Sequence, residues 1–296
     1  MRHLKTRYLN ATILLLLICA VAACTSTTDK TAFSSSSAAD SVAKSLKTKP
    51  MREKNVWLPL FDGKTLNNWT PKFSGYPVGE NVKNTFTVKD GLLTADYSKW
   101  SYFDYTFGHL FFNEVFHYYK IRAEYRFICE QIPGAPDWAA RNNGLFVHAQ
   151  SAESMWLNQD FPSGVEIQFL GGIVPGESRS TGNLCRSNVN VDIDGKKAID
   201  RCIRSSSETY YGDQWVTAEI HVRGSERITH YINGQQVFDY TNIRRTHEFN
   251  ETQLGETTVS RDIGSGYIAI QAESQPTQFR KIEIMILDDP FDKGGE

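Results

Sequence analysis

The sequence predicts an all-β protein, an antiparallel β-sandwich of the jelly-roll type. Apolar and polar side chains alternate with a period of two at many places after residue 50, and the 3.6-residue period of amphipathic helices is nearly absent there. Turn residues bound these alternating segments. Many short strands joined by turns, with no helices between them, favour two antiparallel sheets packed face to face.

The individual strands follow from this alternation. In residues 119–127, Lys, Arg, Glu and Arg lie on one predicted face and Tyr, Ile, Ala, Tyr and Phe on the other. Asn233-Gly234 is a strong hairpin signal, and Asp90-Gly91 marks another turn. The other clearly alternating strands are residues 165–169, 216–222 and 267–273.

The length fits one such domain behind an export segment. Of the 296 residues, about 240 remain for the fold, which is normal for a single sandwich. We divide the chain into a signal peptide (1–23), a flexible tether rich in Ser, Thr, Ala and Lys (24–50) and one β-sandwich domain (51–296). The net charge of −2 provides no basic surface, so nucleic acid is not an expected partner.

The N-terminus is typical of an exported lipoprotein. Basic residues precede an apolar run at 11–23, which is too short to cross a bilayer comfortably. The run ends in Val-Ala-Ala before Cys24, the pattern of small residues that precedes a lipid-modified Cys. A generic signal peptide with a chance Cys is the alternative. Thr25 is not an acidic retention signal, so we expect a lipid anchor in the outer membrane, facing the periplasm, as the protein's only contact with a membrane.

Three other cysteines would lie in an oxidising compartment. Cys185 and Cys202 are 17 residues apart in a stretch with weak periodicity, and we predict a disulfide between them. Cys129 is then expected as a buried thiol on a strand. A metal site is the alternative, although no CxxC or HxxxH spacing accompanies these residues.

Several motifs resemble, in order, those of the 3-keto-disaccharide hydrolase domain family. The match begins at residues 57–69, WLPLFDGKTLNNW, and covers roughly residues 55–288. Each motif is weak alone, but their shared order is specific. The later motifs are NNGLFVH (142–148), GVEIQ (164–168), DQW (213–215), GYIAIQAE (266–273) and FRKI (279–282).

This resemblance implies a concanavalin-like jelly roll whose concave sheet holds a sugar. It also implies cleavage of glycosides already oxidised at C3, so a separate 3-oxidising dehydrogenase is an expected pathway partner. The sequence departs from the family pattern at Asn143, where Ser is usual, and at His148, where Arg is frequent. A long insert carries Cys185 and Cys202. These departures concern the substrate more than the fold.

A ketone at C3 changes the chemistry that cleavage requires. It acidifies the hydrogen at C2 and places the C1 leaving group β to that carbon. A base can remove the C2 proton, the enolate can expel the aglycone, and water can then add. This route needs a base, an acid for the leaving group and a group that stabilises the enolate.

Strand alternation selects the residues that could share one face. We expect His148 and Glu166 to be the catalytic pair, one as the base and the other as the acid or orienting group. An Arg or a bound cation would stabilise the enolate. The sequence requires no cofactor, although a divalent cation remains an option. The expected substrate-binding residues are Asn142, Gln168, Gln271, Glu273, Arg122 and Arg126.

Other interpretations remain open. Glu166 could form a structural ion pair, and His148 could be a polar residue on a wet face. A carbohydrate-binding module without catalysis would need the same aromatic and amide groups, and an envelope lipoprotein with a purely structural role is a third alternative. An ordinary retaining glucanase is disfavoured, because that class typically shows Glu-x-Asp-x-x-Glu on one strand, whereas Glu166 is followed by Gln168 and then by Phe169-Leu170-Gly171. Trp100, Tyr102, Tyr105 and His109 precede a strand and are candidates for a cleft wall in an aromatic loop.

Overall fold

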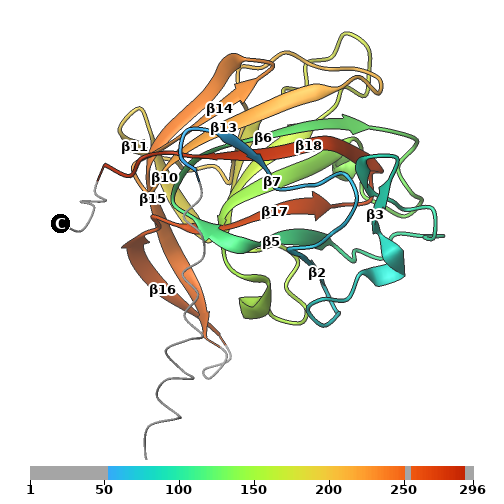
Figure 1. Cartoon of the computed structure of the whole chain (residues 1–296), viewed down its shortest axis with the longest axis horizontal. Coiled ribbons are helices and arrows are strands. Elements are labelled where there is room, and N and C mark those ends of the chain that lie inside the picture. The colour runs from blue at the N-terminus through green and yellow to red at the C-terminus, as the bar shows by residue number, and fades with distance from the viewer. Residues whose placement is uncertain (1–52, 251–254, 291–296) are drawn as a thin grey trace, which may run out of the picture. The chain divides into compact units, whose positions relative to one another are not determined.

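Two antiparallel sheets make up the computed structural model, which describes residues 53–250 and 255–290 (Figure 1). Apart from three short 3₁₀ turns, η1 (Val82–Asn84), η2 (Asp137–Ala139) and η3 (Ala152–Ser154), the regular elements are strands. The predicted all-β jelly-roll sandwich is confirmed.

One sheet has eleven strands and the other has seven. The order of the eleven-stranded sheet is β11 (Lys196–Lys197), β10 (Val189–Ile193), β15 (Gln235–Asn250), β14 (Arg227–Ile232), β13 (Val216–Arg223), β6 (Tyr118–Phe127), β18 (Thr277–Ile286), β4 (Leu92–Ala95) and β3 (Phe86–Lys89), with β1 (Trp57–Pro59) on β18 and β16 (Gly255–Asp262) on β15. The order of the seven-stranded sheet is β12 (Cys202–Ile203), β9 (Asn183–Ser187), β8 (Gly164–Leu170), β7 (Asn142–Ala149), β17 (Gly266–Ala272), β5 (Gly108–Phe116) and β2 (Trp69–Phe73).

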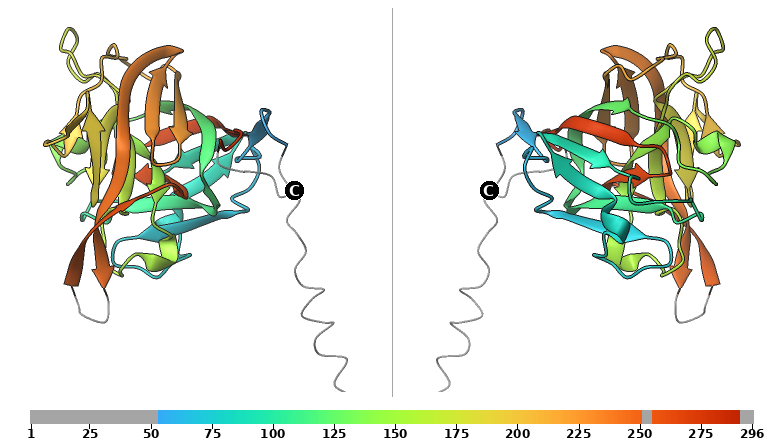
Figure 2. Two further views of the ribbon diagram at one scale, coloured as in Figure 1. Left: turned by 90° about the vertical axis from the view of Figure 1, so that its left-hand side faces the viewer. Right: turned by 90° about the vertical axis from the view of Figure 1, so that its right-hand side faces the viewer.

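The two turns predicted from the sequence connect neighbouring strands in the structure. Asn233 and Gly234 both have positive φ between β14 and β15, as do Asp90 and Gly91 between β3 and β4, which is the backbone conformation that tight hairpin turns require. The hairpin of β15 and β16 extends beyond the edge of the sheets (Figures 1 and 2).

The main core lies between the two sheets. Leu145, Val147 and Ile167 of the seven-stranded sheet are fully buried in the same cluster as Ile121 of the eleven-stranded sheet. Across the interface, the Tyr125 ring stacks on Phe169 with ring centroids 4.2 Å apart. Because side chains alternate along a strand, the residues between these core positions on β7 and β8 lie on the outer face of the seven-stranded sheet.

The charged face of β6 lies on the outside of the opposite sheet. Arg122 pairs with Glu283 at 2.6 Å and stacks over the Trp57 ring. Arg126 donates two hydrogen bonds to Gln278. The prediction that Arg122 and Arg126 bind substrate beside Glu166 is therefore wrong, because β6 and β8 belong to different sheets.

The disulfide joins two neighbouring strands of the seven-stranded sheet. Cys185 on β9 lies directly opposite Cys202 on β12, with 4.1 Å between their Cα atoms. Cys129 is not the expected buried strand thiol. It is exposed and has a positive φ, because β6 ends two residues earlier at Phe127.

The signal peptide, Cys24 and the tether predicted from the N-terminal sequence fall outside the described residues. Within the described part of the chain, no helix has the length and apolar character needed to span a membrane.

Candidate functional site

A row of polar residues crosses the outer face of the seven-stranded sheet. Lys72 on β2 pairs with His109 on β5, and His109 pairs with Gln271 on β17. On the other side, Gly144 of β7 pairs with Gln168 of β8, which pairs with Asn183 of β9. Because Ile270 pairs with Leu145, Gln271 is next to Gly144 and joins the two halves. Six strands thus contribute to one polar stripe.

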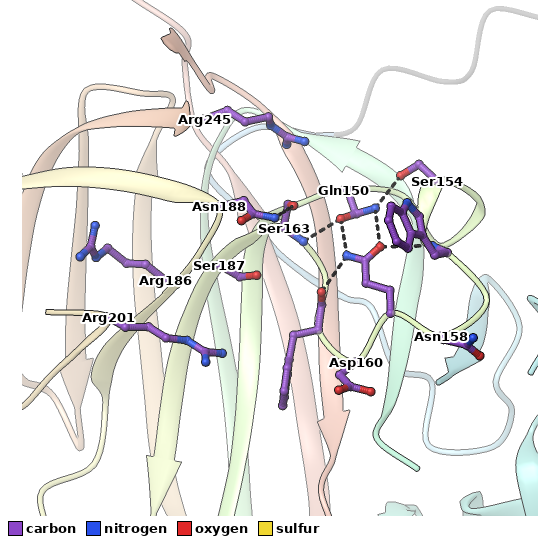
Figure 3. Close-up of a pocket in the computed structure, with 13 residues that line it drawn as sticks. Gln150, Ser154, Asn158, Asp160, Ser163, Arg186, Ser187, Asn188, Arg201 and Arg245 are labelled. Atoms are coloured by element: carbon purple, nitrogen blue, oxygen red, sulfur yellow. Dashed lines mark hydrogen bonds between the residues drawn. The ribbon is translucent and has the colours of Figure 1, made fainter. Parts of the chain in front are cut away.

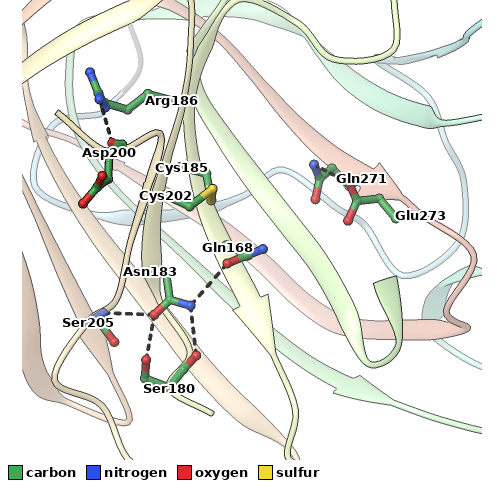
Figure 4. Close-up of a disulfide and its surroundings, with 10 residues drawn as sticks. All are labelled: Gln168, Ser180, Asn183, Cys185, Arg186, Asp200, Cys202, Ser205, Gln271 and Glu273. Carbon is green, nitrogen blue, oxygen red and sulfur yellow. Dashed lines mark hydrogen bonds between the residues drawn. A yellow bond between two sulfur atoms is a disulfide. The ribbon is translucent and has the colours of Figure 1, made fainter. Parts of the chain in front are cut away.

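Two glutamates flank this stripe close to its centre. The Gln271 amide donates to Glu273 Oε1 at 3.2 Å (Figure 4), and Gln271 also hydrogen-bonds Glu166. Gly144 makes room for both contacts, since a Cβ atom at that position would lie 2.4 Å from Gln271 Oε1 and 2.8 Å from Glu166 Oε1. A residue without a side chain thus allows an amide to bridge two carboxylates.

Burial makes these carboxylates hard to ionise. Glu166 is 7% exposed and Glu273 is 2% exposed. Loss of hydration raises the pKa of Glu166 to about 7. Burial also raises the pKa of Glu273 well above its usual range, and the neighbouring Glu166 charge adds to that rise. The positive charge of Arg201 opposes both shifts. Near neutral pH the pair therefore retains a proton, with one acid and one carboxylate side by side.

His109 lies beside the pair as a neutral imidazole. Its ring packs against Phe146 and Phe161, with centroids 5.3 and 5.9 Å apart. Burial and the positive charge of Lys72 lower the pKa of His109 to about 3. Lys72 is held in place by hydrogen bonds to the carbonyl oxygens of Phe73 and Leu157.

Several buried polar atoms on this face have unused hydrogen-bonding capacity. Among the described residues, no protein partner is found for either ring nitrogen of His109, either side-chain polar atom of Asn142, Gln271 Oε1 or Glu273 Oε2. Buried polar atoms are usually paired, so a cluster of unpaired ones indicates a surface that can bind a polar molecule.

A cavity of about 670 Å³ lies beside this polar face (Figure 3). Phe161 and Arg201 line it, and the Arg201 guanidinium lies 5.7 Å from the centre of the Phe161 ring. The same two residues connect the cavity with the polar face, because Phe161 packs on His109 and the charge of Arg201 acts on both glutamates. A paired Gln150 and Gln159, joined by a 2.9 Å hydrogen bond, forms part of another wall.

Five of the sequence-predicted residues come together on this face. Asn142, Glu166, Gln168, Gln271 and Glu273 all lie on its central strands or directly after them. The side-chain oxygen Oε1 of Gln168 accepts a hydrogen bond from the Asn183 side-chain amide at 3.2 Å (Figure 4).

His148 is not among them. Between the pairs Tyr267–Ala149 and Ala269–Phe146, β7 has one more residue than β17, which is a β-bulge. His148 has a φ of 51° there, and its Nε2 makes a 2.9 Å hydrogen bond with the carbonyl oxygen of Gly224 in the β13–β14 turn. The structure does not bring His148 to Glu166, because the bulge breaks the alternation on which that prediction rested.

The buried imidazole of His148 has a structural environment. Burial lowers the pKa of His148 to about 4, with smaller contributions from His117 and Arg245, while the hydrogen bond to Gly224 acts in the opposite direction. No glutamate contributes to this shift. His148 therefore joins the two sheets at one end of the sandwich.

Sequence reasoning missed Lys72 and Arg201, and it named His109 only as part of an aromatic loop that could form a cleft wall. The aromatic run around His109 indicated a loop, but residues 108–116 form β5, with His109 and Phe111 on the outer face and Leu110 in the core. That alternation is readable, although aromatic residues on both faces obscure it. Arg201 precedes β12 and carries no periodic signal. In the described part of the chain, no group of three or more His, Cys, Asp or Glu side chains could hold a metal ion.

The fold and the outer face together define a class. The protein is an antiparallel β-sandwich, and the outer face of one of its sheets carries amides, a neutral imidazole and a buried carboxylate pair that shares a proton.

Within this class the family is specific. The chain belongs to the family of the 3-keto-alpha-glucoside-1,2-lyase-like domain, whose model matches residues 56–285. No curated protein matches the sequence.

Solved structures also resemble this chain. A candidate glycosyl hydrolase from Parabacteroides distasonis is 17% identical with a TM-score of 0.47, covering 79% of this chain and 100% of that one. A Bacillus subtilis protein with a galectin-like fold is 12% identical with a TM-score of 0.46, covering 80% and 100%. The carbohydrate-binding module CBM66 of Bacillus subtilis is 6% identical with a TM-score of 0.34, covering 60% and 81%.

Proposed function

We propose that this protein cleaves 3-keto-glycosides by elimination and hydration on the outer face of the seven-stranded sheet. The observation that carries the proposal is the buried Glu166–Glu273 pair, which retains a proton near neutral pH. A base with a pKa of about 7 is suited to removing a proton made acidic by a neighbouring ketone. Membership of the 3-keto-alpha-glucoside-1,2-lyase-like family supports the same substrate class.

Glu166 is the proposed base. It is the more exposed of the two glutamates, and its pKa of about 7 lies near neutrality. Its carboxylate takes the C2 proton, and the electrons of the C2–H bond form the enolate. The enolate expels the aglycone by breaking the C1–O bond, and the departing oxygen takes up a proton. Water then adds across the C1–C2 double bond, placing hydroxyl on C1 and hydrogen on C2.

The neighbouring residues are proposed to stabilise the intermediates. Glu273 in its acid form can donate a proton, which a lone carboxylate could not do. Asn142 and the neutral His109 have unused hydrogen-bonding capacity for the sugar hydroxyls and the enolate oxygen. Arg201 supplies positive charge to the same region. The proposed place of action is the cell envelope, which is supported by the N-terminal sequence alone, and a dehydrogenase that oxidises C3 must supply the substrate.

A chromogenic 3-keto-glucoside tests this proposal. The domain from residue 51 onward should release the aglycone, and Glu166→Gln should lower kcat/KM by about 10²–10⁴-fold, the usual contribution of a general base. Glu124→Gln is the matched control, since Glu124 pairs with Lys281 on the outside of the other sheet. Substrate carrying deuterium at C2 should react more slowly with the wild-type domain.

The outcomes separate the candidate functions. Sugar binding without release of the aglycone would refute catalysis and favour a carbohydrate-binding module. Wild-type rates in Glu166→Gln would refute the assignment of the base. Activity that is lost with a chelator and restored by added metal would show that a cation, and not the protein alone, stabilises the enolate.

A further inference from the structure

The cavity beside the glutamates is rich in positive charge. Its lining includes Arg186, Arg201 and Arg245 but only one acidic residue, Asp160. Asp160 is itself engaged elsewhere, because it accepts a 2.7 Å hydrogen bond from Ser74 and interacts electrostatically with Lys72. The cavity therefore has an excess of positive charge that its own carboxylate does not neutralise.

The three arginines differ in what they can offer a ligand. Arg186 donates hydrogen bonds to the backbone carbonyl oxygens of Val189, Ile199 and Asp200, so it has a structural role. In the described part of the chain, Arg201 and Arg245 make no ion pair with a carboxylate. Their guanidinium groups point into the cavity from two different sides (Figure 3).

Arg245 lies among like charges. Burial lowers its pKa, and Arg261 adds to that effect. Arg245 also disfavours the charged form of His148. A half-buried guanidinium near other cations gains from an anionic ligand, and its planar donors match an oxyanion such as a carboxylate or a sulfate.

We propose that this cavity selects glycosides that carry an anionic oxygen group, a carboxylate or a sulfate ester, on the residue attached to the 3-keto sugar. This inference rests on the proposed function of the neighbouring glutamates. The volume of about 670 Å³ falls within the range of ligand pockets, which is about 300–1,000 Å³. Phe161 offers a ring face to the sugar, while Arg201 and Arg245 bind the anion.

The test compares ligands that differ only in the anionic group. Binding of a disaccharide, of its 6-carboxylate and of its 6-sulfate is measured by titration calorimetry, with none of the three oxidised at C3. The better anionic ligand should bind at least about tenfold more tightly than the neutral disaccharide, as expected for a charge-assisted hydrogen bond. The preference should fall steeply with added salt.

Variants identify the residues responsible. Arg245→Gln should reduce the preference for the anionic ligand to about threefold or less, and Arg201→Gln should have the same direction of effect. Arg227→Gln is the matched control, since it also removes one positive charge but lies on β14 of the other sheet, paired with Asp239 at 2.9 Å. If Arg245→Gln does not fold, Arg245→Lys keeps the positive charge but lacks the planar guanidinium with its paired N–H donors. It should therefore still weaken binding of the carboxylate or sulfate.

Two results would overturn the inference. One is equal affinity of the wild-type domain for the neutral and both anionic disaccharides. The other is an anion preference that survives Arg245→Gln in a folded protein. Because these ligands are not substrates, the result is independent of whether the domain cleaves 3-keto-glycosides. Comparing the carboxylate with the sulfate identifies which of the two groups the cavity prefers.

Discussion

Replacing Gly144 with Ala should separate activity from stability more clearly than any other single change. Gly144 lies in the middle of β7, and its φ is not in the left-handed region, so Ala suits the backbone. The added methyl group would meet Gln271 Oε1 at 2.4 Å and Glu166 Oε1 at 2.8 Å. Both contacts are too close, so the amide and the carboxylate must move apart.

The cost to the fold should be modest. Overpacking a buried site costs about 1–3 kcal/mol, and replacing Gly in a compatible conformation returns about 0.4–1 kcal/mol by restricting the unfolded chain. A net loss of about 1–2 kcal/mol corresponds to a fall in Tm of about 2–8 °C for a domain of this size. The cost to catalysis should be much larger, because a displacement of about 1 Å at a catalytic group can lower the rate about 100-fold.

The assay measures kcat/KM on a 3-keto-glucoside together with thermal unfolding. Gly172→Ala is the matched control, because its methyl group would meet the Tyr211 ring at 2.4 Å, away from the glutamates. We expect a similar fall in Tm for both variants and a fall in kcat/KM only for Gly144→Ala. Wild-type activity in Gly144→Ala would show that the close approach of Gln271 and Glu166 is not part of the active arrangement.

Three other changes test the site and the fold. The raised pKa of Glu166 means that the folded protein holds a proton that the unfolded chain releases above about pH 4.5, so the contribution of Glu166 to stability falls as the pH rises from about 4.5 to about 7. Glu166→Gln should therefore have a higher Tm than the wild type at pH 8 but not at pH 4. Equal Tm values at pH 8 would contradict the argument that burial of Glu166 destabilises its charged form. Replacing Cys185 and Cys202 with Ser opens a loop of 17 residues and should cost about 3 kcal/mol, which calorimetry should show as a Tm lower by about 6–12 °C. Asn at position 148 tolerates the positive φ but loses the hydrogen bond to Gly224. We therefore expect His148→Asn to lower the free energy of unfolding by about 1–3 kcal/mol and to keep kcat/KM within about threefold of the wild type. A large fall in kcat/KM at unchanged Tm would show that His148 takes part in catalysis.

Alternation alone determined much of the glutamate site. Once Val165 and Ile167 are assigned to the core, Glu166 and Gln168 must lie on the opposite face, because successive side chains on a strand point to opposite sides. The same argument placed Gln271 correctly. Each of these assignments needed only the sequence of one strand, and in the structure each residue lies on the face that its sequence predicted.

The remaining features depended on contacts between distant segments. Arg122 and Arg126 share a face, as their spacing requires, but only strand pairing decided that β6 belongs to the sheet opposite Glu166. The bulge at His148 appears only when β7 is aligned with β17, more than 100 residues later in the chain. Arg201 and Phe161 reach this polar face from segments without periodicity. The sequence by itself thus determined which side of a strand each residue occupies, whereas the tertiary structure decided which strands are neighbours, because pairing depends on the packing of the whole sandwich.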